Sequence, residues 1–88
     1  TTHFSADFDC MASMVAAQKL YPEAKMVFSG SMEKPLQEYL KALNPPFHFS
    51  RIKEVDLDRV TRLIIVDTRD PERIGIFKNL FYFIKNLF

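Results

Sequence analysis

Two stretches of the chain carry small and apolar residues in the pattern of a helix. Residues 9–20 are nearly all small or apolar, which is typical of a helix largely buried against a sheet. A second helix is predicted to begin near Pro35, since proline is tolerated in the first turn, and to end at the Asn-Pro-Pro of residues 44–46. Its apolar face contains Leu36, Tyr39, Leu40 and Leu43.

Strands are predicted between and beside these helices. Residues 1–3 read as the end of one strand, residues 24–28 as a second and residues 47–52 as a third. Residues 63–66 form a continuous apolar run, which is typical of a strand buried on both faces of a parallel sheet. These four segments supply the strands of the predicted sheet.

Asp70 and Pro71 predict a third helix, because a capping carboxylate precedes a proline at the first helical position. The elements therefore run strand, helix, strand, helix, strand, strand, helix. This order favours an α/β fold with a parallel, doubly wound (Rossmann-like) sheet, flanking helices and right-handed crossovers. No internal boundary interrupts the pattern, so residues 1–88 are expected to belong to one domain.

Composition adds three constraints. The net charge of +1 gives no general electrostatic reason to expect nucleic-acid binding. The single cysteine, Cys10, excludes an internal disulfide and is expected to be a packed thiol in a reducing compartment. A reducing compartment makes a cytoplasmic location the expectation, and no membrane contact is expected because no apolar run reaches the roughly 18 residues that a membrane-spanning helix needs.

The end of the chain is strongly apolar. Residues 76–88 are rich in aromatic side chains and contain only two charged residues, Lys78 and Lys85. A segment of this kind would expose a large apolar patch if nothing covered it. We therefore expect it to pack on the rest of a longer chain or on another subunit.

An imidazole and two carboxylates are crowded into residues 3–9, as His3, Asp7 and Asp9. Two neighbouring carboxylates repel each other unless a cation lies between them. A loop between a strand ending near His3 and a helix beginning near Asp9 would place all three at the carboxyl edge of the sheet. With no thiolate in the set, manganese or magnesium is the favoured ion. The alternative is that Asp7 or Asp9 caps the helix and His3 merely ends a strand.

A second acidic position strengthens the metal interpretation. Asp67 directly follows the apolar run 63–66 and would lie at the carboxyl end of that strand. The ends of neighbouring parallel strands lie side by side, so Asp67 can face the same crevice as the loop after His3. An aspartate that only begins a turn is the alternative. His48 is interpreted as a structural residue.

These residues resemble the motifs of the DHH phosphoesterases. The first motif of that family is matched by His3, Asp7, Asp9 and Ser13, and the second by Asp67. Residues 67–75 are most similar to DHH domains of long bacterial proteins that also carry CBS domains and a tRNA nucleotidyltransferase (poly(A) polymerase-like) region. Ala6 departs from the proline that usually precedes the first Asp. The Asp-His-His motif and the fourth-motif Asp are not found, so the chain is expected to be the N-terminal half of a DHH domain.

The resemblance implies metal-assisted hydrolysis of a phosphodiester or phosphoanhydride by two ions about 4 Å apart. In that scheme His3 and Asp7 hold the first ion, Asp9 contacts the second, and Asp67 bridges the two, which makes Asp67 and Asp9 the catalytic pair. The substrate would be a phosphate-containing small molecule or a short oligonucleotide. The 88-residue chain alone is expected to be inactive.

Three further residues are assigned supporting roles. Ser13 is expected to orient a ligand carboxylate through a hydrogen bond. Arg69 and Arg73 could contact phosphate, although exposed arginines at a helix start are the alternative. Two other functions stay open: a haloacid-dehalogenase-type phosphatase built on the Asp-x-Asp of residues 7–9, and a non-catalytic metal- or nucleotide-binding or interaction module within a tRNA nucleotidyltransferase-like protein.

Overall fold

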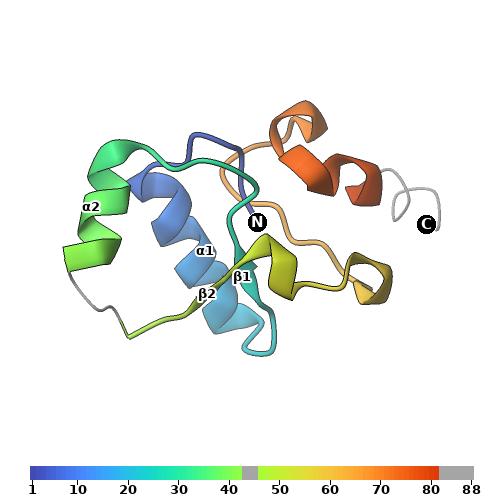
Figure 1. Cartoon of the computed structure of the whole chain (residues 1–88). Coiled ribbons are helices and arrows are strands. Elements are labelled where there is room, and N and C mark those ends of the chain that lie inside the picture. Colours follow the sequence, from blue (N-terminus) through green and yellow to red (C-terminus); the bar gives the residue numbers. More distant parts are fainter. Residues whose placement is uncertain (43–45, 82–88) are drawn as a thin grey trace.

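The computed structural model describes residues 1–42 and 46–81 and has a small α/β fold (Figure 1). Helix α1 (Phe8–Leu20) is followed by strand β1 (Met26–Val27), helix α2 (Lys34–Ala42) and strand β2 (Phe49–Ser50). The two strands are parallel, with Met26 opposite Phe49 and Val27 opposite Ser50. The α/β class and the parallel pairing are thus confirmed for the described residues.

Helix α1 begins at Phe8, one residue earlier than the sequence pattern indicated, because Asp7 acts as its N-cap. The Asp7 side chain accepts a hydrogen bond from the backbone nitrogen of Cys10 at 3.0 Å, which satisfies a donor that the helix itself cannot. Cys10 and Met14 are buried on the inner face. The cap therefore fixes where the helix starts and which side of its first turn faces the core.

Helix α2 packs beside the start of α1. Pro35 lies in its first turn, as predicted, and Leu36 is completely buried with Ala6 and Cys10. The ring of Tyr39 meets the ring of Phe8 edge to face, with centroids 5.4 Å apart. The predicted helix end, with Leu43, Asn44 and Pro45, lies outside the described residues.

The predicted strand at 63–66 is not a regular strand, and the assigned strands are shorter than predicted. Even so, the backbone nitrogen of Thr1 donates to the carbonyl of Ile64 at 2.8 Å, and the nitrogen of Val66 donates to the carbonyl of Thr1 at 3.0 Å. This is the hydrogen-bond pattern of a parallel pair. Residues 63–66 are half-buried rather than buried, because Leu63, Ile64 and Val66 border open pockets.

Both faces of these extended segments are covered. Leu63 and Ile65 pack on a core cluster formed by Val27, Ile74 and Phe77. Ile64 and Val66 instead line a small cavity beside residues of α1. The alternation follows from extended backbone, in which successive side chains point to opposite faces. Helix α1 and residues 74–77 are therefore on opposite sides of the same layer (Figure 1).

The predicted third helix is a pair of 3-10 turns, Pro71–Arg73 and Gly75–Phe77, followed by helical residues 78–81. Asp70 caps the first turn, since its side chain accepts from the nitrogen of Glu72 at 2.9 Å. The helix is interrupted because Gly75 adopts a left-handed conformation with φ of 60°. The cap was predicted correctly, and the continuous helix was not.

Only part of the apolar tail can be compared with its prediction. Phe77 is buried in the core, whereas Ile76 is 46% exposed. Residues 82–88 lie outside the described part of the chain. Among the described helices, none is both long and apolar enough to cross a membrane.

Candidate metal centre

His3 lies at the end of the segment that pairs with residues 64–66, and its side chain is almost completely buried. Its Nδ1 atom is 2.7 Å from the carbonyl oxygen of Phe4. A contact this short to a carbonyl requires a proton on Nδ1. Arg73 Nη2 lies 3.3 Å from the same nitrogen, and in this tautomer the contact brings two N–H groups together. The Nε2 atom is then left with a free lone pair.

Cys10 comes from the first turn of α1 and is completely buried. Its Sγ atom is 3.1 Å from His3 Nε2 and 3.3 Å from Asp67 Oδ2. Burial raises the pKa of the Cys10 thiol to about 11, since the charged thiolate loses its hydration. Without a cation, the thiol therefore keeps its proton at neutral pH.

Asp67 is the third member of the group and directly follows the extended segment 63–66. Its backbone is in the left-handed region with φ of 61°, which side-chain-bearing residues adopt at a cost and aspartate tolerates better than most. Its Oδ2 atom is 3.6 Å from His3 Nε2, and its side chain is 36% exposed. Strained backbone of this kind often marks a functional position. Here the unusual φ accompanies the placement of the carboxylate beside the imidazole.

His3, Cys10 and Asp67 together offer three ligand atoms that all lie within 4.8 Å of one another. The imidazole lone pair and the carboxylate both accept hydrogen bonds, and the thiol has one proton to share between them. A neutral thiol therefore satisfies only one of its two neighbours at a time. A divalent cation would be bound by the imidazole nitrogen, the thiolate sulfur and the carboxylate oxygen at once. This group is therefore the candidate metal centre within the described residues.

The sequence placed four ligands here, and the structure brings two of them together. His3 and Asp67 meet, although they are 64 positions apart in the sequence. Asp7 is used as the cap of α1, and Asp9 is exposed at the next turn position. Neither belongs to the group of converging ligand atoms. The alternative, in which Asp7 caps the helix, is confirmed, and the ligand roles of Asp7 and Asp9 stay predictions.

The residues with predicted supporting roles also differ in whether the structure brings them to the group. Ser13 is half-buried on α1, and no hydrogen bond from its side chain to a ligand is found among the described residues. Arg69 is exposed. Arg73 reaches the His3 ring, and its carbonyl accepts from the nitrogen of Phe4 at 2.8 Å. His48 is exposed and outside the group.

Cys10 is the member of the group that sequence reasoning missed. The interpretation of a packed, buried thiol was correct as far as packing goes. A usable signal was its place in the first helical turn, three residues after the capping Asp7, which points its side chain back toward the strand end. The neighbours on that strand end are fixed only by tertiary contacts, so the sequence could not identify them.

The cap of α1 gives a test of pH dependence. The hydrogen bond from the Cys10 backbone holds the pKa of Asp7 below its usual value. The stabilisation is therefore present above the unfolded-state pKa and is lost as the pH falls through the lowered folded-state pKa. Asp7→Ala should lower the free energy of unfolding by about 1 kcal/mol at neutral pH, and Asp7→Asn by much less. Urea unfolding in metal-free buffer would measure both.

The same experiment in acid supplies the control. The difference in stability between the wild type and Asp7→Ala should shrink in acid as the carboxyl is protonated, whereas asparagine carries no titratable group. An unchanged difference in acid would show that the side-chain charge does not contribute to the cap.

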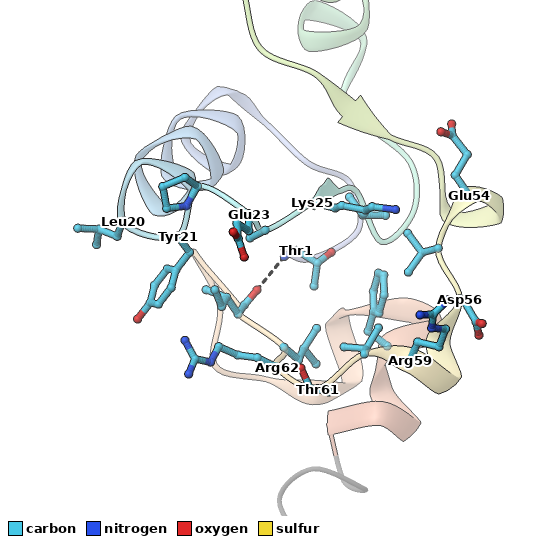
Figure 2. A pocket seen from close by; sticks show the side chains of 18 residues that line it. Thr1, Leu20, Tyr21, Glu23, Lys25, Glu54, Asp56, Arg59, Thr61 and Arg62 are labelled. Carbon is cyan, nitrogen blue, oxygen red and sulfur yellow. Dashed lines mark hydrogen bonds between the residues drawn. The ribbon is translucent and has the colours of Figure 1, made fainter.

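A large groove lies apart from the metal centre. It has a volume of about 1200 Å³ and is formed by the end of α1, the approach to β1 and residues 54–64. In Figure 2 a dashed line from Thr1 marks its hydrogen bond to the carbonyl of Ile64, and charged side chains of both signs are drawn around the groove. The cations are Lys25, Arg59 and Arg62, and the acids are Glu23, Glu54 and Asp56. This balance gives no preference for an anionic or cationic ligand.

Comparison with known proteins gives one informative match. No family model and no solved structure matches the chain. The chain is 51% identical over 78 residues to an A-adding tRNA nucleotidyltransferase of Geobacter sulfurreducens. The match covers 88% of this chain and 9% of that protein. The DHH resemblance stays a prediction, and the chain is homologous to part of an A-adding tRNA nucleotidyltransferase.

Proposed function

We propose that this chain is a divalent-metal-binding module of a tRNA nucleotidyltransferase-like protein. The observation that carries the proposal is the convergence of His3 Nε2, Cys10 Sγ and Asp67 Oδ2 on one small volume. The homology to part of an A-adding tRNA nucleotidyltransferase supports the larger context.

The surroundings of the group favour metal binding over a purely structural role. The bond from His3 Nδ1 to the Phe4 carbonyl fixes the ring and directs the Nε2 lone pair toward Cys10 and Asp67; a carbonyl contact of this kind is the usual second contact of a metal-binding histidine. Asp67 is held in place by the parallel pairing of Val66 with Thr1. Its partly exposed carboxylate gives an ion a route from solvent.

The position of the group also supports the prediction of a doubly wound, Rossmann-like sheet. Thr1 pairs with the 64–66 segment in parallel, and β1 pairs with β2 in parallel. His3 and Asp67 then lie at the carboxyl ends of two adjacent extended segments. Ligand sites of doubly wound sheets lie at such ends, and this agrees with a Rossmann-like arrangement.

A second candidate function is metal-dependent phosphoesterase activity in a full-length protein that contains this chain. The specific observation in its favour is the strained backbone of Asp67 next to His3, with the Arg73 guanidinium beside the ring. Asp67 would bridge the ions and Asp9 would contact the second, with manganese or magnesium as the metal. Arg73 would bind a phosphate oxygen of the substrate.

Calorimetric titration of the chain with zinc and manganese tests the metal-binding function. We expect saturable binding of one ion, with His3→Ala and Asp67→Ala each lowering the affinity at least tenfold, because each removes a direct ligand. Asp58→Ala is the matched control for Asp67→Ala, since it removes an exposed carboxylate outside the group. If both ligand variants bound metal as the wild type does, the proposed centre would be wrong.

A further inference from the structure

We infer that Cys10 is itself a metal ligand and that the centre selects a thiophilic, tetrahedral ion of the zinc and cobalt class. This inference rests on the proposed metal-binding function and identifies its ion. The sequence set of His3, Asp7, Asp9 and Asp67 favours hard ions. The group that the structure assembles replaces the two loop carboxylates with one thiol.

The spacing of the ligand atoms fits a tetrahedral ion. The three edges of the group measure 3.1 Å from Sγ to Nε2, 3.3 Å from Sγ to Oδ2 and 3.6 Å from Nε2 to Oδ2. Bond lengths of about 2.0 Å to nitrogen or oxygen and about 2.3 Å to sulfur give tetrahedral edges of about 3.3 Å between nitrogen and oxygen and about 3.5 Å from either to sulfur, so each edge of the group is within about 0.4 Å of its tetrahedral value. Octahedral magnesium, with bonds of about 2.05 Å, requires about 2.9 Å between nitrogen and oxygen, which is much shorter than the observed edge of 3.6 Å from Nε2 to Oδ2.

The chemistry of the ligands leads to the same ion class. Sulfur is a soft donor that zinc and cobalt accept, whereas magnesium and calcium prefer oxygen. Binding would break the S–H bond, release the proton to solvent and form the bond from sulfur to metal. His3 and Asp67 would no longer compete for a single thiol proton.

The group also leaves one coordination position of a tetrahedral ion open. It contains three protein ligands among the described residues, and a tetrahedral ion takes four. Zinc sites with three protein ligands keep the fourth position for water or substrate. The exposed side of Asp67 is where that position would open to solvent.

Cobalt substitution tests the inference directly. The chain has one cysteine, so a thiolate-to-cobalt charge-transfer band in the near ultraviolet can come only from Cys10. We expect this band, together with intense tetrahedral visible bands, when the reduced wild-type chain is titrated with cobalt. Cys10→Ser should remove the charge-transfer band and lower zinc affinity at least tenfold. Manganese affinity should change less, because manganese gains little from a thiolate.

The outcomes separate this inference from the proposed function. Saturable cobalt binding without the charge-transfer band would overturn the role of Cys10 and leave the metal-binding function standing. Failure of the wild type to bind zinc, cobalt or manganese would overturn both. The wild-type spectrum decides the matter even if the Cys10→Ser variant fails to fold, and circular dichroism would detect such a failure.

Discussion

Gly75→Ala should cost the protein several kcal/mol of stability, at least about 3 kcal/mol. Two penalties act together at this position. Gly75 has φ of 60°, where a side-chain-bearing residue is strained by about 1–2 kcal/mol. A Cβ atom there would also lie 2.5 Å from the carbonyl oxygen of Ser29, and neither backbone can move without disturbing the buried Ile74 and Phe77.

The expected loss is a large fraction of the roughly 5–15 kcal/mol that stabilises a domain. Urea unfolding followed by circular dichroism measures it. Gly30→Ala is the matched control, because its new Cβ would lie 3.0 Å from the Cβ of Phe4, and Phe4 is partly exposed. We expect about 1 kcal/mol for the control. Equal effects of the two substitutions would mean that the left-handed turn at Gly75 is not formed.

Asp67→Asn should lower the rate of metal-dependent phosphodiester hydrolysis by a full-length protein that contains this chain roughly a thousandfold or more. The expectation rests on the second candidate function, in which Asp67 bridges two ions. Asparagine keeps the size of aspartate and tolerates the left-handed backbone at this position, so the change removes charge without forcing a new conformation. The decisive measurement is turnover of a chromogenic phosphodiester with manganese.

Asp58→Asn supplies the control for this prediction, since it makes the same chemical change on an exposed residue outside the group. It should leave turnover unchanged. Hydrolysis that persists in the Asp67→Asn protein would contradict the bridging role. Absence of hydrolysis in the wild-type full-length protein would favour the non-catalytic metal-binding module.

Much of the fold could be predicted because its signals are local. The run of small and apolar residues predicts α1 within one residue of its start, and Pro35 marks the first turn of α2. The cap by Asp70 also follows from neighbouring residues. The prediction of a continuous helix after Pro71 was wrong. The helix is interrupted at Gly75, whose left-handed turn lies against Ser29, a residue distant in sequence.

The candidate metal centre, too, could be predicted from the sequence only in part. The sequence by itself predicted that His3 and Asp67 lie at the ends of two extended segments, and parallel strands bring such ends together. Only the tertiary structure decided that the Asp7 carboxylate is used as a helix cap and that Cys10 points into the group. Motif spacing indicates which residues are near in sequence, but a ligand set depends on side-chain direction, and that direction is fixed by the cap of α1 and by the pairing of Thr1 with residues 64–66.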